Sequence, residues 1–398
     1  MNLIEVSTPA LAKDFIKANV IIHKNDPCYI RPLDKDIHDV FNKEKNKAFR
    51  SGETIRWVLK DDNGNLVGRI AAFVNKKYKT KGDDGPVGGI GFFDCINNQD
   101  AANLLFDTAK KWLEAKGMTA MDGPINFGER DTWWGLLVQG YEPPLYRMNY
   151  NQPYYKELFE SYGFQPFFNQ VCFGLNVGRR IQEKFYERHA ALSKDPHYSS
   201  DNIKTNNLAK YVKDFTTVYN KAWAGHGGLK QLDERTAMKM FQSMKAVMDE
   251  RISWIVYYKN EPIGAWINLP DLNQWFKYLN GKFSLWDKLR FLWYKRTKPC
   301  DKFVGLVFGI VPEFQGKGVD AYMIIEGCRL IQNLTIENGK YIVGNPIYEK
   351  YEMQWIGEFN PKMINVAESL GTHRSRILTT YRYLFDRGKE FKPHPILS

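Results

Sequence analysis

One segment of the sequence combines the residue types that bind an anion. It reads Val311-Pro-Glu-Phe-Gln-Gly-Lys-Gly-Val-Asp320, and it follows an apolar run and precedes an amphipathic stretch. A strand that leads through a glycine-containing loop into a helix leaves free backbone N–H groups where the helix dipole favours negative charge. Gly316 and Gly318 let the backbone approach a phosphate closely, and Lys317 adds positive charge. The segment contains neither the Walker pattern nor GxGxxG. It therefore predicts a phosphate site of another type, with an ordinary strand–helix turn as the alternative.

This segment resembles the pyrophosphate loop of the GCN5-related N-acetyltransferase superfamily, whose pattern is Arg/Gln-x-x-Gly-x-Gly/Ala. Gln315 and Gly318 match the pattern, whereas Asp320 stands where the superfamily usually has Gly or Ala. The resemblance implies that the loop binds the pyrophosphate of coenzyme A, and that backbone N–H groups before it bind the thioester carbonyl. The candidate cofactor-binding residues are Ile310, Val311, Gln315, Gly316, Lys317, Gly318, Val319 and Asp320.

Further segments extend the resemblance over nearly the whole chain. They are similar to segments of a bacterial two-domain subfamily whose function is poorly known. These segments are Asp122–Asn126, Asn149–Tyr155, Pro270–Asn273, Trp355–Met363 and Tyr381–Tyr383.

The sequence also contains an internal repeat with an offset of 208 residues. Pro153–Gly163 and Pro361–Gly371 share Pro, Glu, Ser and Gly at equivalent positions, and their apolar residues follow the spacing of one helix face. Similar elements precede each copy: a hairpin, a strand, a helix and a further strand. We expect them at 55–74, 87–94, 99–116 and 119–122, and again at 252–269, 303–311, 319–333 and 340–344. Two copies of one α/β unit are therefore predicted.

We thus predict an α/β protein of two tandem acyl-CoA N-acyltransferase-like domains, each a mixed, mostly antiparallel sheet flanked by helices. The first domain spans residues 1–178, and it lacks the pyrophosphate loop because no glycine precedes the helix that follows Phe92–Asp100. Residues 179–202 are expected to form a polar linker. The second domain spans residues 203–398 and is expected to contain the single coenzyme A site.

The catalytic residues are harder to locate in the sequence. Acyl transfer to an amine requires a neutral amine and a stabilised oxyanion. Glu358 is the candidate base, with a solvated carboxylate as the alternative, and Asn360 is a candidate site residue or a helix N-cap. Many superfamily members use a Tyr as the acid, but Ala367 occupies the corresponding position in the second half. Tyr381 and Tyr383 are the remaining candidates for that role.

A basic aromatic insert, residues 274–300, interrupts the second domain. Leu285, Leu289, Leu292 and Trp293 lie at helical spacing beside several Lys and Arg residues. Three functional interpretations compete: a lid over the cofactor, a membrane-surface patch and an RNA contact. The alternative is an amphipathic helix that packs on the protein and leaves a solvated basic face.

Composition excludes several classes of protein. The 398 residues are 43% hydrophobic with a net charge of +11, which argues against disorder and favours anionic ligands. The longest apolar run has nine residues, too few to span a bilayer, and no signal peptide is recognised. Five scattered Cys and seven His residues form no disulfide framework or metal pattern. We expect a reduced, cytoplasmic protein without a metal; His226 is interpreted as a loop residue that borders the substrate at most.

The resemblance implies an acyl-CoA-dependent N-acyltransferase. Its donor is expected to be acetyl-CoA in the first place, or otherwise another acyl-CoA. Its acceptor would be an unidentified small-molecule or peptide amine. One alternative keeps the fold but uses aminoacyl-tRNA, and it would make nucleic acid a partner of the basic insert. The other alternative is a non-catalytic acyl-CoA-binding protein, which the absent Tyr and the Asp320 departure would suit.

Overall fold

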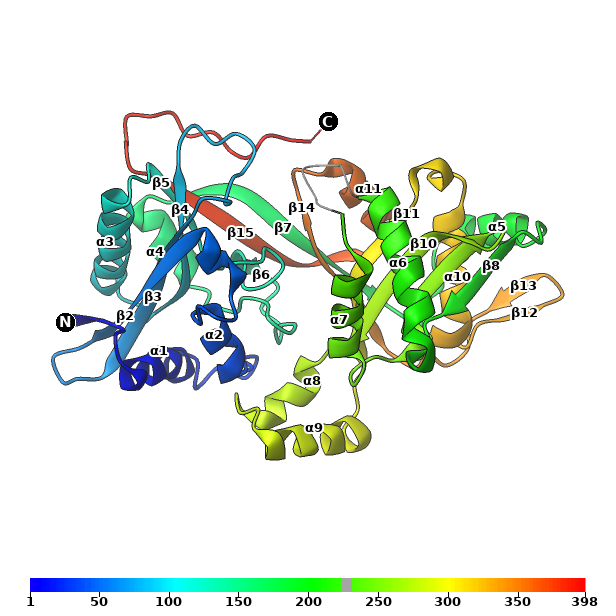
Figure 1. Ribbon diagram of the computed structural model, residues 1–398, viewed down its shortest axis with the longest axis horizontal. Helices are drawn as coiled ribbons and strands as arrows, with labels where there is room; N and C mark the ends of the chain where they lie inside the picture. Colours follow the sequence, from blue (N-terminus) through cyan, green and yellow to red (C-terminus); the bar gives the residue numbers. More distant parts are fainter. Residues whose placement is uncertain (224–230, 398) are drawn as a thin grey trace.

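The computed structural model describes residues 1–223 and 231–397, and it divides into two halves joined by one continuous sheet (Figure 1). Within these residues the sheet has thirteen strands, in the order β1-β2-β3-β4-β5-β15-β7-β14-β11-β10-β9-β8, with β6 added beside β15. Most neighbours are antiparallel; β4–β5 and β11–β14 are parallel. The predicted fold class, two tandem α/β units with mixed, mostly antiparallel strands, is confirmed.

The strands of the first half precede those of the second in the chain, except for the last one. Their bounds are β1 Asn2–Glu5, β2 Gly52–Lys60, β3 Leu66–Asn75, β4 Val87–Cys95, β5 Ala120–Gly123, β6 Leu136–Gln139, β7 Gln165–Asn176, β8 Tyr198–Asn202, β9 Trp254–Tyr258, β10 Glu261–Pro270, β11 Lys302–Ile310, β14 Lys350–Gly357 and β15 His373–Leu384. A separate hairpin is formed by β12 Thr335–Glu337 and β13 Lys340–Ile342.

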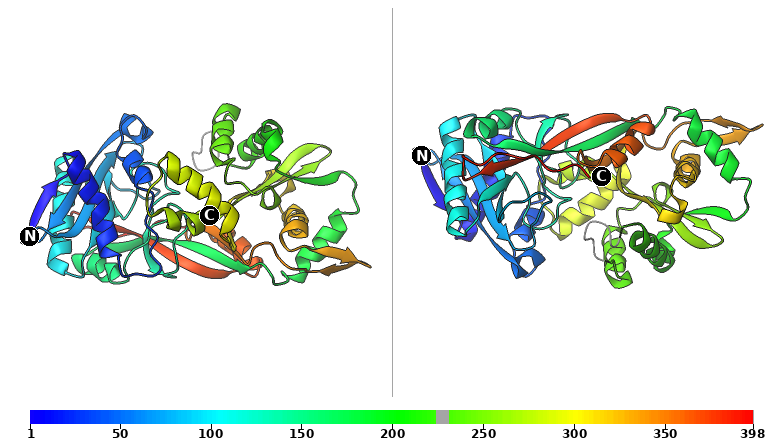
Figure 2. Two further views of the ribbon diagram at one scale, coloured as in Figure 1. Left: turned by 90° about the horizontal axis from the view of Figure 1, so that it is seen from below. Right: turned by 90° about the horizontal axis from the view of Figure 1, so that it is seen from above.

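Helices cover both faces of the sheet (Figure 2). Their bounds are α1 Pro9–Ile22, α2 Asp34–Val40, α3 Gln99–Ala115, α4 Tyr155–Tyr162, α5 Glu183–Leu192, α6 Leu208–Ala222, α7 Glu234–Met244, α8 Asn273–Phe276, α9 Leu285–Thr297, α10 Val319–Ile331 and α11 Pro361–Ser369. Alternation along β3 explains the layers of the first half: Ile70 and Ala72 pack in the cluster that contains α3 residues, whereas Ala71 and Phe73 pack in the cluster that contains α1 residues.

The two halves exchange strands across their junction. β7 and β15 each have twelve residues, begin 208 residues apart and pair antiparallel over most of their length. β15, from the end of the chain, lies between β5 and β7, while β7 pairs on its other side with β14 of the second half. Each half therefore has a strand position filled by the other half of the sequence, and Figure 1 shows these two strands running across the middle of the molecule.

Two local expectations are wrong. Residues 183–192 and 198–202, expected within a linker, form α5 and β8, which pack on α10 and pair with β9. The strand β8 was missed because it is short, polar and at the edge of the sheet. The strand expected at 340–344 is β13, which pairs only with β12 through an Asn338-Gly339 turn; the strand that follows α10 in the main sheet is β14.

Candidate functional site

The second half contains an apolar cavity where two parallel strands separate. β11 and β14 pair only from Lys302–Gly305 with Lys350–Met353, and beyond these residues the two strands diverge. A cavity of about 420 Å³ lies at this opening. Apolar side chains make up most of its lining, from β7, β11 and β14, from the helices α6, α10 and α11, and from α5 and the turn before it. The lining includes Leu175, Phe185, Trp223, Val307, Phe308, Ile324, Cys328, Met353, Trp355, Ile356, Met363, Val366, Ala367 and Leu370.

The predicted phosphate loop lies between β11 and α10, at the edge of this cavity. Gly316 and Gly318 have φ angles of 72° and 84°, a left-handed conformation in which other residues are strained. No side chain caps the start of α10, and the first hydrogen bond of the helix runs from the Tyr322 N–H to the Gly318 carbonyl. Within the described residues, none of the backbone N–H groups from 316 to 321 donates a hydrogen bond. Val319 and Ala321 are fully buried, so the accessible donors of Gly316, Lys317 and Asp320 at this helix N-terminus form a cradle suited to a phosphate group.

The strand before the loop directs further N–H groups toward the cavity. The Val311 N–H donates to the Ile263 carbonyl at 2.9 Å, so it faces β10. Since N–H groups alternate in direction along a strand, those of Ile310 and Phe308 face the side where β14 has separated. The Val311 donor is therefore already engaged, and Ile310 and Phe308 are the groups placed to bind a carbonyl oxygen. Gln315 stabilises the strand end, because its side-chain amide donates to the Ile310 carbonyl at 2.9 Å.

Charged side chains around the loop have opposing effects on an anion. Lys317 is exposed, and the Arg188 side chain on α5 lies beside Gly318, so two cations flank the cradle. Arg188 was not predicted, because its segment was expected to be a linker. Asp320 lies in the first turn of α10 and lines the cavity, where its charge opposes a phosphate but suits the helix dipole.

The three predicted catalytic residues do not come together. Glu358 is about half exposed, accepts a hydrogen bond from the Asn169 amide at 2.8 Å, and does not line the cavity among the described residues. Asn360 caps α11, since its side chain accepts from the Met363 N–H at 3.3 Å. Tyr381 is buried in the core of the first half and donates to Glu160 at 2.9 Å; burial, and then Glu160, raise its pKa.

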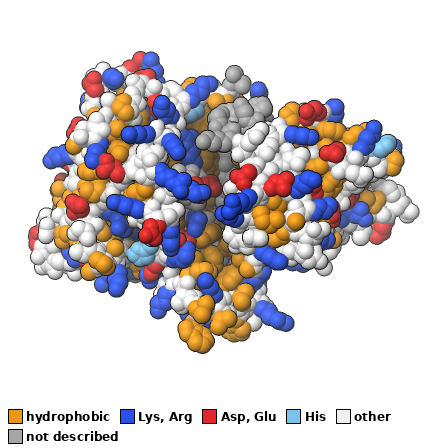
Figure 3. Space-filling model, in the orientation of Figure 1, with side chains coloured by type: hydrophobic (Ala, Val, Ile, Leu, Met, Phe, Trp, Pro, Cys, Tyr) orange, Lys and Arg blue, Asp and Glu red, His pale blue; other side chains and the backbone are white. Residues whose placement is uncertain are grey.

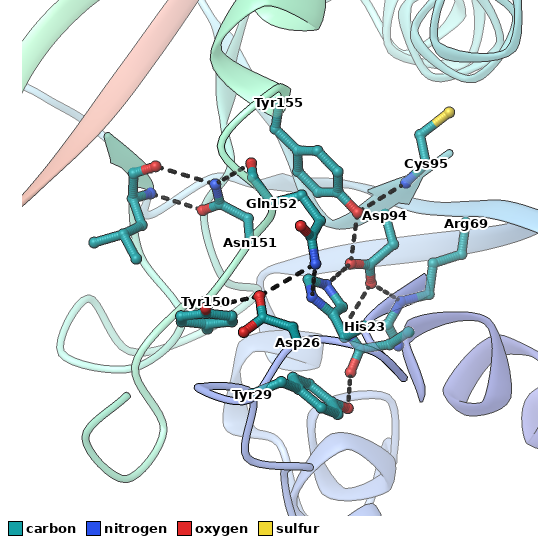
Figure 4. Close-up of polar contacts among 12 residues, drawn as sticks. His23, Asp26, Tyr29, Arg69, Asp94, Cys95, Tyr150, Asn151, Gln152 and Tyr155 are labelled. Atoms are coloured by element: carbon teal, nitrogen blue, oxygen red, sulfur yellow. Dashed lines mark hydrogen bonds and ion pairs between the residues drawn. The ribbon is translucent and has the colours of Figure 1, made fainter. Parts of the chain in front are cut away.

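The first half has no equivalent cradle. The helix that follows β4, α3, is capped by Asn98, whose side chain accepts from the Ala101 N–H at 2.8 Å. Polar side chains instead fill the space beside β4 (Figure 4). Asp94 accepts hydrogen bonds from Arg69 at 2.6 Å and Tyr155 at 3.1 Å, and it contacts His23 at 3.0 Å. Burial alone would raise the pKa of Asp94, but Arg69 and His23 outweigh it and hold the pKa below its usual range.

A buried ion cluster holds the strands together at the base of the cavity. Glu352 on β14 accepts hydrogen bonds from Lys302 on β11 at 3.0 Å and from Arg376 on β15 at 2.7 Å. Arg376 also donates to the carbonyls of Glu142 and Pro143 in the first half. Burial opposes the charge of Glu352, but Arg376 and Lys302 lower its pKa to about 2. The cluster therefore fixes the point from which β11 and β14 diverge.

The cavity also contains residues that sequence patterns did not single out. Asp131, from the loop between β5 and β6 of the first half, and Asp320 are the two acidic residues among those that line the cavity in the described chain. Tyr351 lies over Gly305, where a Cβ atom would clash with its hydroxyl; burial raises the pKa of Tyr351 to about 12. Trp223 lies over Gly309 in the same manner. The two glycines were the only signal available, because each lies in an otherwise bulky strand.

The described residues form neither a metal site nor a membrane-spanning helix. No cluster of three or more His, Cys, Asp or Glu side chains among the described residues has the geometry to hold a metal ion. In the same part of the chain, each helix is too short or too polar to cross a bilayer. His226 lies outside the described residues.

Comparisons with known proteins concern the family and the fold of this chain. No family model matches the chain. Two curated proteins are similar over nearly its whole length: a bacterial ceramide synthase from Caulobacter vibrioides, 25% identical over 94% of this chain and 95% of that protein, and the protein YghO from Escherichia coli, 23% identical over 90% and 89%.

Two solved structures share the fold. A tandem GNAT protein from the clavulanic acid biosynthesis pathway matches with a TM-score of 0.53 and 9% identity, over 98% of this chain and 99% of that one. A GCN5-related glucosamine N-acetyltransferase region of a fungal β-N-acetylglucosaminidase matches with a TM-score of 0.52 and 10% identity, over 96% of this chain and 38% of that one. The chain has the tandem fold of the GCN5-related N-acetyltransferases, and the resemblance predicted from its sequence is confirmed.

Proposed function

We propose that this chain is an acyl-CoA-dependent N-acyltransferase whose donor carries a long acyl chain. The observation that carries the proposal is the apolar cavity of about 420 Å³, which opens between β11 and β14 beside the free N–H groups of residues 316–321. The cradle suits the pyrophosphate of coenzyme A, and the diverging strands suit its extended arm. The first half supplies no second cradle, so one donor site per chain is expected.

The size and lining of the cavity favour a long acyl group over acetyl. At about 30 Å³ for each water-sized group, the cavity has room for about 14 such groups, more than an acetyl group and the adjacent thioester require. Its lining is rich in Ile, Leu, Val, Phe and Trp side chains. Each buried methylene contributes about 0.8 kcal/mol, so a long chain gains affinity that acetyl does not.

The acceptor we propose is the amino group of a lipid-like long-chain base. The relative from Caulobacter vibrioides is named a bacterial ceramide synthase. A ceramide is the amide of a fatty acid with a sphingoid base, and its synthesis from a thioester is the acyl transfer described above. A long-chain amine also suits a cavity whose lining is mostly apolar.

Asp131 is the proposed base in place of Glu358. Asp131 lines the cavity from the first half, so the reaction would take place where the two halves meet. Asp131 accepts the proton that the amine loses as its nitrogen bonds to the thioester carbon. The N–H groups of Phe308 and Ile310 stabilise the oxyanion while the carbon–sulfur bond breaks and coenzyme A leaves as a thiolate. A thiolate is a stable leaving group, which is consistent with Ala367 at the position of the usual Tyr.

Purified chain incubated with palmitoyl-CoA and a sphingoid base tests the proposal. We expect release of free coenzyme A with formation of the N-acyl amide, identified by mass spectrometry. Asp131→Asn should lower kcat at least tenfold. Glu129→Gln, in the same loop, is the matched control and should retain activity. No amide with any acyl-CoA would refute the proposed function, and full activity of Asp131→Asn would refute the role of Asp131.

A further inference from the structure

Helix α9 presents an apolar face to solvent. Leu285, Trp286, Leu289, Leu292 and Trp293 are each more than half exposed, with Leu285 and Trp286 at 77%. Their spacing places all five on one stripe of the helix. Elsewhere among the described residues, Ile396 is the one large hydrophobic residue that is more than half exposed. Figure 3 shows apolar side chains gathered at the lower tip of the molecule, where α9 projects below the junction of the halves in Figure 1. Such a patch marks an interaction surface.

The opposite side of the helix is firmly anchored, so the exposed face is not the result of a loose segment. Phe291 packs with Trp275, Phe276 and Leu33 in one buried cluster. The segment before α9 is tied to the first half, because the Asp34 N–H donates to the Gly281 carbonyl at 2.8 Å. Ser284 and Asp287 form a capping box at the start of the helix. The insert is therefore held in place with its apolar stripe pointing outward.

Basic side chains surround this stripe. Residues 277–298 contain seven Lys or Arg residues and one acidic residue, Asp287. Among the described residues, only Arg290 of these seven pairs with a carboxylate, namely Asp287. Lys288 lies beside the stripe on the helix and Arg296 lies at its C-terminal end, so both charges flank the apolar face. A partner that fits this surface must be apolar at its centre and negatively charged at its edge.

We propose that α9 docks the protein on an anionic lipid surface. Leu and Trp side chains would enter the interface, and Lys288, Arg296 and their basic neighbours would contact lipid phosphates. Trp is suited to this depth because its ring is amphipathic. Nucleic acid fits less well, since Leu285, Leu289 and Leu292 offer no aromatic face for a base to stack on. Lipid docking by α9 is a property separate from acyl transfer. The use of that docking to reach lipid substrates rests on the proposed function.

Flotation of the full chain with vesicles tests the docking. Vesicles of phosphatidylcholine alone are compared with vesicles that also contain phosphatidylglycerol, and the chain should float mainly with the latter. The double variant Trp286→Ser/Trp293→Ser should lose at least about tenfold in vesicle partitioning. Lys288→Glu/Arg296→Glu should weaken binding to anionic vesicles by about fivefold or more for each charge changed. Ile336→Ser/Ile342→Ser, at two exposed apolar residues of the β12–β13 hairpin, is the matched control and should float as the unchanged chain does.

Three results would overturn the docking proposal. In the first, the unchanged chain does not float with vesicles of either lipid composition. In the second, the double Trp variant floats as well as the unchanged chain. In the third, the hairpin control loses flotation as much as the Trp variant does. An RNA partner or a second copy of the chain on α9 would give the first result. Circular dichroism of each variant establishes that it is folded. The flotation measurement uses no acyl-CoA and no amine, so its outcome is independent of whether the proposed acyl transfer is correct.

Discussion

Blocking the cavity should separate long acyl donors from short ones. Val366 lines the cavity from α11 and is 40% exposed, so a larger side chain can be placed there without repacking a core. In Val366→Trp the indole ring would occupy space that the acyl chain uses in the unchanged protein. Asn365→Trp is the matched control, because Asn365 is the preceding residue of the same helix, is exposed, and does not line the cavity.

The expected loss of donor affinity follows from the number of methylene groups that the apolar cavity can bury. In the unchanged chain, each methylene buried in the cavity should improve donor affinity by up to about fourfold, from about 0.8 kcal/mol per group. If the indole displaces about four methylenes, palmitoyl-CoA loses about 3 kcal/mol, or about two hundredfold in Kd. Acetyl-CoA, which does not fill the cavity, should bind Val366→Trp about as well as it binds the unchanged chain.

Titration calorimetry with acetyl-, octanoyl- and palmitoyl-CoA measures these affinities. The unchanged chain and Asn365→Trp should show affinity that increases with chain length until the cavity is full. Val366→Trp should bind the three donors with similar affinities. An unchanged chain that binds all three donors equally, or a Val366→Trp variant that weakens all three equally, would refute the assignment of the cavity to the acyl chain.

Two further predictions concern the cradle and the buried ion cluster. Gly318→Val should lower coenzyme A affinity at least tenfold in calorimetry, because a Cβ strains the left-handed residue by about 1–2 kcal/mol and shifts the adjacent N–H groups. The control Gly339→Val imposes the same strain at φ 77° in a distant turn. Weaker coenzyme A binding by Gly339→Val would contradict this explanation. For Glu352, the folded pKa of about 2 lies below the ordinary 4.5, so its stabilisation is complete above pH 4.5 and is lost as the pH falls toward 2. Glu352→Gln should lower the free energy of unfolding at pH 7 by about 3 kcal/mol and make that free energy depend less on pH between 4.5 and 2. The control Glu349→Gln, at an exposed neighbour, should change neither. Equal denaturant titrations of Glu352→Gln and the unchanged chain would exclude a stabilising role of the Glu352 carboxylate.

Local patterns in the sequence were sufficient for much of the fold. The loop around Gly316 and Gly318 was recognisable because a strand, a glycine turn and a helix are each encoded by a few neighbouring residues. The repeat of Pro153–Gly163 and Pro361–Gly371 likewise predicted two related units, and both copies contain helices, α4 and α11. By contrast, β8 was missed because a short polar strand at a sheet edge has no alternating apolar pattern.

The candidate site was only partly visible in the sequence. Gly316 and Gly318 were singled out by their place between a strand and a helix, and Gln315 by the resemblance to the pyrophosphate loop of the GCN5-related N-acetyltransferases. Asp131 and Arg188 were not found, because they come from a loop of the first half and from an expected linker, and nothing in their local sequence connects them with residue 318. Tyr381 was assigned to the wrong half, since its position late in the chain suggested the second domain whereas β15 lies in the sheet of the first.

The sequence by itself predicted a loop where a phosphate could bind, and it determined that the chain repeats one α/β unit and that a basic, apolar helix interrupts the second copy. Only the tertiary structure decided that β7 and β15 exchange between the halves, that β11 and β14 diverge above Glu352 to open a cavity, and that α9 turns its Leu and Trp side chains outward. The physical reason is the range of the interactions. Turn conformation and helix periodicity depend on residues a few positions apart, whereas strand pairing and cavity shape depend on contacts between residues about two hundred positions apart, which local patterns do not specify.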